Sequence, residues 1–107
     1  MRFEIVLAPS AVRELRDLPA HLRALVRDEI ERHLRHEPRK ESRSRIKRLR
    51  GLSQPQYRLR VGELRVFYDV KHATVEVLTI ISKEQAARWL EEEGTVDPGG
   101  AAGEGEG

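Results

Sequence analysis

Residues 57–70 read YRLRVGELRVFYDV, and this stretch decides the architecture around it. Two runs of alternating side chains flank Gly62-Glu63, a pattern that predicts a β-hairpin with a two-residue turn. Such a turn places Arg60 directly opposite Arg65, and directly opposed residues share one face of the sheet. One face of the hairpin is then wholly apolar or aromatic, with Tyr57, Leu59, Val61, Leu64, Val66 and Tyr68 on it.

The other face of this hairpin is cationic. It carries Arg58, Arg60, Arg65 and Phe67. Like charges opposed across a strand pair destabilise a sheet by about 0.2–1 kcal/mol, so stability alone does not favour this pattern. An arginine fork donates two parallel hydrogen bonds to phosphate, so this face is predicted to bind phosphate, with Phe67 as a π-surface beside it. A structural alternative is that Asp69 and Glu76 neutralise the arginines, since both share this face if the next hairpin has a four-residue loop at 71–74.

The patterning of the remaining chain predicts an α+β fold. The expected order is a strand at 2–7, a helix hairpin at 9–36 broken at Pro19, an antiparallel meander of three strands at about 56–61, 64–70 and 74–81, and a C-terminal helix to about Glu93. Ser82-Lys83-Glu84-Gln85 fits the capping-box pattern, so the Ser82 side chain is expected to cap that last helix. The Arg-rich segment 37–56 is expected to be an irregular loop, with a short turn of helix near Ile46.

Composition places the chain among small globular domains. Its 107 residues correspond to one domain, expected over residues 1–93, and the Gly, Ala and Glu content of residues 94–107 predicts a disordered tail. Cysteine is absent, which excludes a disulfide framework and a thiolate metal site. No apolar run reaches the roughly 18 residues of a membrane span, and no signal peptide is evident, so we expect a cytoplasmic protein without membrane contact.

The net charge of +2 conceals a strong asymmetry along the chain. The last 17 residues hold six acidic side chains and no Lys or Arg, so residues 1–90 carry 20 basic against 12 acidic side chains, a difference of +8. Ten of the 20 basic residues fall within residues 36–65, against three acids. A basic body of this kind indicates a polyanion or an acidic protein as partner.

Two strings carry a family resemblance. RLRGL at 48–52 followed by YRLRVGELRVFY at 57–68, within this order of elements, resembles the RelE/ParE superfamily of type II toxin–antitoxin toxins. The resemblance covers roughly residues 2–93. It implies a RelE-like fold, an acidic antitoxin as partner, and no metal or other cofactor. RelE-like members cut messenger RNA in the ribosomal A site, whereas ParE-like members poison DNA gyrase.

The resemblance also implies site residues. RelE-like nucleases use basic residues on the second strand of the sheet, which Arg58 and Arg60 match, and an arginine on the third strand, which Arg65 matches. They also use a basic residue just after the fourth strand and often a Tyr or His in the C-terminal segment. This chain departs from that pattern. Glu84, next to Lys83, stands just after the fourth strand, and Trp89 or Leu90 stands where the Tyr or His is expected.

Metal-free RNA cleavage needs a base for the ribose 2′-OH, cations for the charge on phosphorus oxygens, and an acid for the leaving 5′-oxygen. The arginines supply the cations but cannot act as the base, because a guanidinium stays protonated. Lys83 and Glu84 are therefore the candidates for proton transfer, although an acid in the first turn of a helix is also favoured by the helix dipole alone. Further basic residues are candidates for binding ribosomal RNA or an acidic antitoxin, or are simply solvated; they are Arg43, Arg45, Lys47, Arg48 and Arg50.

Two hypotheses follow for the function. The first is a ribosome-dependent mRNA endonuclease, favoured because a gyrase-binding surface does not obviously require opposed arginines. The second is a ParE-like gyrase inhibitor, or a weakened member that only binds its antitoxin. This second hypothesis is motivated by the missing arginine after the fourth strand and the absent Tyr or His.

Overall fold

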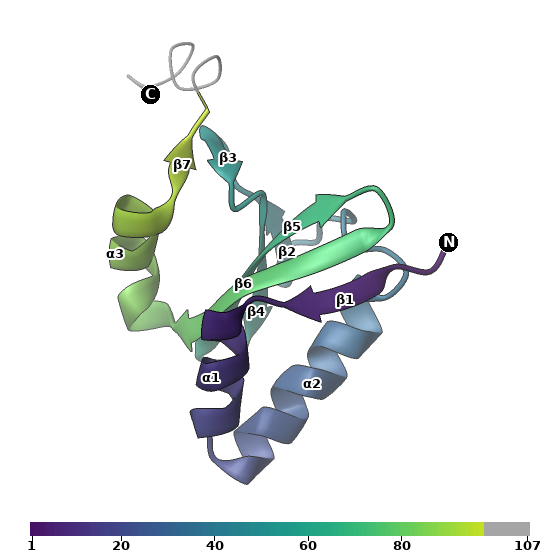
Figure 1. Ribbon diagram of the computed structural model, residues 1–107, viewed down its shortest axis with the longest axis vertical. Helices are drawn as coiled ribbons and strands as arrows, with labels where there is room; N and C mark the ends of the chain where they lie inside the picture. Colours follow the sequence, from purple (N-terminus) through teal and green to yellow (C-terminus); the bar gives the residue numbers. More distant parts are fainter. Residues whose placement is uncertain (98–107) are drawn as a thin grey trace.

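The structure is a computed structural model that describes residues 1–97 (Figure 1). In chain order its elements are β1 (Glu4–Leu7), α1 (Pro9–Asp17), α2 (Ala20–Leu34), β2 (Ile46–Arg48), β3 (Leu52–Gln54), β4 (Tyr57–Val61), β5 (Leu64–Lys71), β6 (Thr74–Ser82), α3 (Lys83–Glu93) and β7 (Thr95–Val96). The predicted α+β order of strand, helix hairpin, meander and C-terminal helix is confirmed. None of the helices in this part of the chain has the length and apolar character needed to cross a membrane.

The main sheet has five strands in the order β1-β6-β5-β4-β2. Strands β4, β5 and β6 form the antiparallel meander, β1 adds parallel to β6, and β2 adds antiparallel to β4. A separate two-stranded sheet pairs β3 with β7. In Figure 1, α1 and α2 lie together as a hairpin while α3 lies apart from them.

The register of the first hairpin is the predicted one. Arg60 pairs with Arg65 and Arg58 pairs with Phe67 across β4 and β5. Gly62 in the turn has a φ of 57°, a left-handed conformation that glycine adopts without steric cost. The four-residue loop expected at 71–74 is wrong, because Lys71 and Thr74 are paired and only two residues form the second turn.

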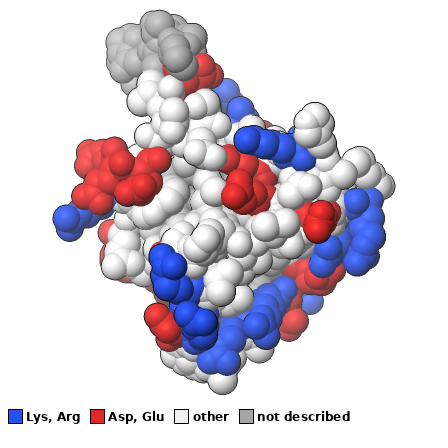
Figure 2. Space-filling model, in the orientation of Figure 1, with Lys and Arg blue, Asp and Glu red and all other residues white. Residues whose placement is uncertain are grey.

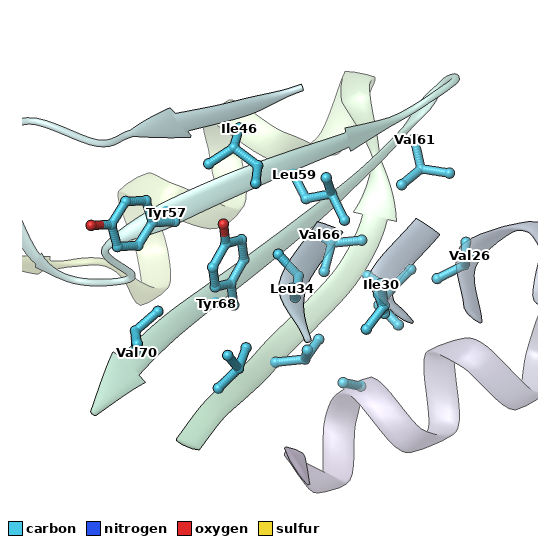
Figure 3. Close-up of a cluster of buried hydrophobic side chains, with 14 of the residues drawn as sticks. Val26, Ile30, Leu34, Ile46, Tyr57, Leu59, Val61, Val66, Tyr68 and Val70 are labelled. Carbon is cyan, nitrogen blue, oxygen red and sulfur yellow. The ribbon is translucent and has the colours of Figure 1, made fainter. Parts of the chain in front are cut away.

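The apolar face of the sheet forms the core (Figure 3). Leu59 and Val66 are completely buried there, and they pack in one cluster with Val26 and Leu34 of α2. The Tyr68 hydroxyl donates a 2.6 Å hydrogen bond to the backbone oxygen of Pro38, and burial raises the pKa of Tyr68. The predicted division of the hairpin into an apolar face under the helices and a cationic face opposite is therefore confirmed.

The Arg-rich segment 37–56 differs from the expectation. No turn of helix forms near Ile46, because this side chain is 3% exposed and enters the core as the first residue of β2, in register with Leu59. The outer edge of β2 is covered by its own approach segment, since the Ile46 oxygen accepts from Ser42 N and Arg48 N donates to the Glu41 carboxylate. Covering an edge in this way prevents pairing with another chain.

The C-terminal part of the described chain also differs in detail. Ser82 is the N-cap residue of α3, but its side chain makes no capping hydrogen bond, so that prediction is wrong. The expected disordered tail begins with an ordered segment, because Thr95 and Val96 form β7 and pair with β3. The rest of the expected tail, residues 98–107, lies outside the described residues.

Candidate functional site

Three guanidinium groups lie together on the face of the sheet away from the α1–α2 hairpin. We call Arg58 and Arg60 of β4 and Arg65 of β5 the arginine cluster. Arg60 and Arg65 are directly opposed, and Arg58 is two residues along the same strand face. Arg60 is exposed, whereas Arg58 and Arg65 are partly buried. The hairpin register alone fixes this convergence.

The arginine cluster has no ion-pair partner among the described residues. Burial lowers the pKa of Arg58, and the positive charges of Arg65 and Arg60 lower it further. Arg58 Nε is buried without a hydrogen-bond partner, and Arg65 Nη1 donates only to the backbone oxygens of Gly62 and Leu64. Within residues 1–97, no carboxylate forms an ion pair with any of the three. The nearest acidic influence is that of Glu63, whose pKa Arg65 and Arg60 help to lower although it is ion-paired with Lys83.

The two acids that were the alternative explanation do not pair with the cluster. Asp69 is 2% exposed, and its carboxylate accepts hydrogen bonds from Gln54 Nε2 at 2.7 Å and from Gln56 N at 2.8 Å. Glu76 is the cross-strand partner of Asp69, and among the described residues it forms no ion pair. Asp69 instead fixes the chain that enters β4.

Lys47 extends the positive face onto the edge strand. It is the register partner of Arg58 across β2 and β4, so the two side chains leave the sheet on the same side. Its side chain is exposed and has no ion-pair partner in the described part of the chain. Three adjacent strands thus contribute a basic side chain to one face.

The two candidates for proton transfer lie at the start of α3. Lys83 Nζ is 2.9 Å from a carboxylate oxygen of Glu63, and Lys83 N donates to the Glu63 backbone oxygen. The hydrogen bond and charge of Lys83 lower the pKa of Glu63, and Arg65 and Arg60 lower it further. Glu84 is exposed in the first turn of α3 and has no ion-pair partner within residues 1–97. The structure thus brings Lys83, through Glu63, to the rim of the cluster.

The predicted π-surface is covered. Phe67 is 1% exposed, and its ring is stacked on that of Trp89 with centroids 5.4 Å apart and planes 2° apart. Trp89 therefore packs α3 onto the sheet, and Phe67 has no free ring face in this arrangement. Nothing in the local sequence distinguishes an exposed ring from one covered by a later helix.

The basic residues of 43–50 do not form one surface. Arg45 donates to the buried carboxylate of Glu29 at 2.9 Å, which ties the approach segment to α2. The Arg48 guanidinium lies 5.3 Å from the centre of the Tyr57 ring and donates to Gln56 O. Arg43, Lys47 and Arg50 are exposed and form no ion pair within the described residues.

The sequence pattern does not reveal the contacts of two acids: Glu63, which lies beside the cluster, and Glu29, which holds Arg45 to α2. The local pattern places Glu63 only in a turn and Glu29 only in a helix, because both contacts join residues distant in the chain. The signal for Glu63 was the turn itself, which places any side chain there at the end of the cluster face. In residues 1–97, no three His, Cys, Asp or Glu side chains are grouped to hold a metal ion.

The fold and this face define a class of small α+β protein that has a helix hairpin under one face of its sheet and basic side chains on the other. The sequence model described as the ParE toxin of the type II toxin–antitoxin system parDE matches residues 5–87. The chain therefore belongs to this family, and the predicted membership of the RelE/ParE superfamily is confirmed. A search of curated proteins returned no match.

Solved structures of toxin–antitoxin complexes have the same fold. The RelBE2 complex from Mycobacterium tuberculosis matches with a TM-score of 0.63 and 25% identity over 78% of this chain and 93% of that chain. The RelE–RelB complex from Pyrococcus horikoshii OT3 matches with a TM-score of 0.57 and 27% identity over 78% and 97%. The RelB–RelE complex from Methanococcus jannaschii, at 21% identity and a TM-score of 0.59 over 78% and 96%, shows the fold alone.

Proposed function

We propose that this toxin cuts messenger RNA on the ribosome, with the arginine cluster at the scissile phosphate. The observation that carries the proposal is the convergence of three guanidinium groups that form no ion pair with a carboxylate of the described residues. Opposed like charges are unfavourable in a free sheet, and a phosphate between them would convert this repulsion into charge-assisted hydrogen bonds. A surface that only contacts protein does not need this arrangement.

The neighbouring residues support a division of labour in cleavage. The arginine cluster stabilises the charge that develops on the phosphorus oxygens. Lys83 is the candidate to donate a proton to the leaving 5′-oxygen. Glu63 and Glu84 are the carboxylates available to accept the 2′-OH proton, and the lowered pKa of Glu63 keeps it ionised at neutral pH. Substitution of each by Gln separates their roles.

A second candidate function is inhibition of DNA gyrase. It is favoured by one observation, namely that Lys83 is already ion-paired with Glu63 and the arginines cannot accept a proton. The family description, which carries the ParE name, is consistent with it. In this case the arginine cluster would serve binding and not bond cleavage.

We infer an acidic, amphipathic antitoxin segment as partner of the α1–α2 side. A groove of about 450 Å³ lies between β1, α1 and α2, with Leu7, Val12 and Leu15 as apolar lining and Arg16, Arg23 and Arg27 as basic lining. Val12 is 44% exposed there, and Figure 2 shows basic side chains gathered over this hairpin. The similar solved structures are complexes with antitoxins, which supports a protein partner of this class.

Mapping of message 5′ ends after induced expression tests the endonuclease proposal. The wild-type chain should produce cuts clustered within codons, and R60A and R65A should abolish them while retaining antitoxin binding. K71A is the matched control, because Lys71 is exposed on β5 but lies at the opposite end of the strand. DNA-damage signalling without message cleavage would instead support gyrase as the target.

A further inference from the structure

The helix α3 covers the cationic face with an aromatic ring and negative charge. Phe67 is the register partner of Arg58, so the covered ring is the immediate neighbour of the arginine cluster. The ring placed over it belongs to Trp89, parallel within 2° at a centroid distance of 5.4 Å. Residues 83–93 hold four acidic and two basic side chains, and Figure 2 shows acidic side chains grouped over α3. A flat ring beside negative charge is also what a nucleotide presents to a protein.

The attachment of α3 to the sheet is slight. None of its residues is buried, in contrast to α1 and α2. Its first residue, Lys83, forms an ion pair with Glu63, and both side chains are about half exposed or more. Exposed ion pairs of this kind contribute little to stability. Its far end is held through the two residues of β7. Elements with few buried contacts open locally at a free energy well below that of global unfolding.

We propose that Phe67 is a nucleobase-binding residue and that Trp89 occupies its place until RNA arrives. A base displaces the indole from the Phe67 ring while the adjoining phosphate enters the arginine cluster. This rests on the proposed function for the identity of the ligand as RNA. Aromatic side chains on the surface of a sheet stack unpaired bases, and stacking tolerates any base because each has a π-face.

The state of Arg58 supports displacement over simple addition of RNA to the closed face. Its Nε is buried without a partner, and burial is the main cause of its lowered pKa. Opening of the adjacent helix would expose this donor to a phosphate oxygen. Removal of α3 would also carry its acidic side chains away from the incoming strand, so both charge and stacking favour exchange once RNA is present.

Trp89 is the only tryptophan of the chain, so the tryptophan fluorescence of the protein reports whether this side chain is displaced. Titration with hexa-adenylate should shift its emission to the red and increase quenching by acrylamide, in parallel with binding followed by anisotropy of a labelled oligonucleotide. Inorganic tripolyphosphate, which has charge but no base, should compete for the cluster and leave the emission unchanged. In R58A the shift should be lost at the same oligonucleotide concentration.

Two further variants separate stacking from folding. F67L retains an apolar side chain under α3 but should bind hexa-adenylate about tenfold more weakly, the order expected from loss of one stacked base. W89L removes the competing ring and should bind at least as tightly as the wild-type chain. Tighter or equal binding of hexa-adenylate by W89L would support displacement. Direct stacking of the base on Trp89 would instead require W89L to bind more weakly.

The inference is overturned if hexa-adenylate binds without a change in Trp89 emission, if W89L binds more weakly, or if no oligonucleotide binds. These outcomes are distinct from failure of the proposed function. A chain that binds hexa-adenylate with displacement of Trp89 but cuts no message would retain the base site and lose the endonuclease assignment. A chain that cuts message with unchanged Trp89 emission would retain the endonuclease assignment and lose the base site.

Discussion

Arg58 is the residue in which the conflict between stability and binding is most visible. It is partly buried beside two other guanidinium groups, which together with burial lower its pKa. Each opposed like charge in a sheet costs a fraction of a kcal/mol, and a buried donor without a partner adds to that cost. Such local violations are expected where a site is shaped for its ligand.

Replacement of Arg58 by Met tests this conflict. The variant keeps an apolar stem of similar length and removes the charge, so the free energy of unfolding should rise by about 0.5–1 kcal/mol while toxicity falls. Urea unfolding followed by circular dichroism measures the change, with K71M on the same sheet as the control. A less stable R58M would mean that the guanidinium is held favourably and that the cluster is not strained.

The arginines could be placed from sequence because a tight turn fixes which residues of a hairpin face each other. Gly62 has the backbone conformation that such a turn needs, so the register follows directly. The partners of these residues could not be placed in the same way. Glu63 and Lys83 are 20 positions apart in the chain, and Phe67 and Trp89 are 22 apart, so both contacts depend on where α3 packs.

At the scale of elements, Glu63 links the first hairpin to the start of α3. The pKa of Glu63 is lowered by its hydrogen bond to Lys83 and by nearby positive charge. A carboxylate with a lowered folded-state pKa stabilises the fold above its usual pKa, and this contribution is lost as the pH falls through the lowered value. The attachment of α3 should therefore weaken in acid.

Trp89 emission between pH 6 and pH 2.5 measures this attachment. The wild-type chain should show a small red shift below about pH 4, the ordinary range of a glutamate, and E63Q should lack this transition because its side chain does not titrate. E31Q is the control, because Arg35 lowers the pKa of Glu31 on α2, far from α3 along the chain. An identical acid transition in E63Q and the wild-type chain would assign the anchoring of α3 to other contacts.

A second link between elements is Glu14 of α1. Strand β1 ends at Leu7, and beyond it the Glu14 carboxylate accepts hydrogen bonds from Thr79 Oγ1 at 2.8 Å and from Ile80 N at 2.9 Å. The side chain thus takes the place of a neighbouring strand at the edge of β6. Without it, two donors of the sheet would lack a partner.

Replacement of Glu14 by Ala should lower the free energy of unfolding by about 1–3 kcal/mol, the cost of unsatisfied buried donors. Thermal and urea unfolding measure this loss. D17A, an exposed acid three residues further along the same helix, should change stability by less than about 0.5 kcal/mol. Equal effects of the two substitutions would indicate that only helix charge matters at this position.

The elements themselves were predictable to different degrees. The two N-terminal helices and the meander have long periodic patterns and appear where expected. Strands β2, β3 and β7 span two or three residues each, which is too short for alternation to be recognised. Ile46 illustrates the difference, because one apolar residue in a basic segment fits a helical turn or a strand equally well until the sheet is present to receive it.

At the scale of the whole molecule, the sheet separates two surfaces for which we propose different partners. One face is apolar and packs on the α1–α2 hairpin, which carries a basic groove suited to an acidic antitoxin. The other face holds the arginine cluster and is partly covered by the acidic helix α3. The basic excess of residues 1–90 is therefore divided between two surfaces, and we assign one to a protein partner and the other to RNA.

The salt dependence of RNA binding tests the central claim, that the arginine cluster engages phosphates, most directly. Each phosphate contact to a single strand contributes about −0.7 to the slope of log K against log salt concentration, so three contacts predict a slope near −2 for the wild-type chain. R60A and R65A should each reduce its magnitude by about 0.7, and K71A should leave it unchanged. A slope near −2 that persists in both cluster variants, or binding that does not depend on salt, would contradict the claim.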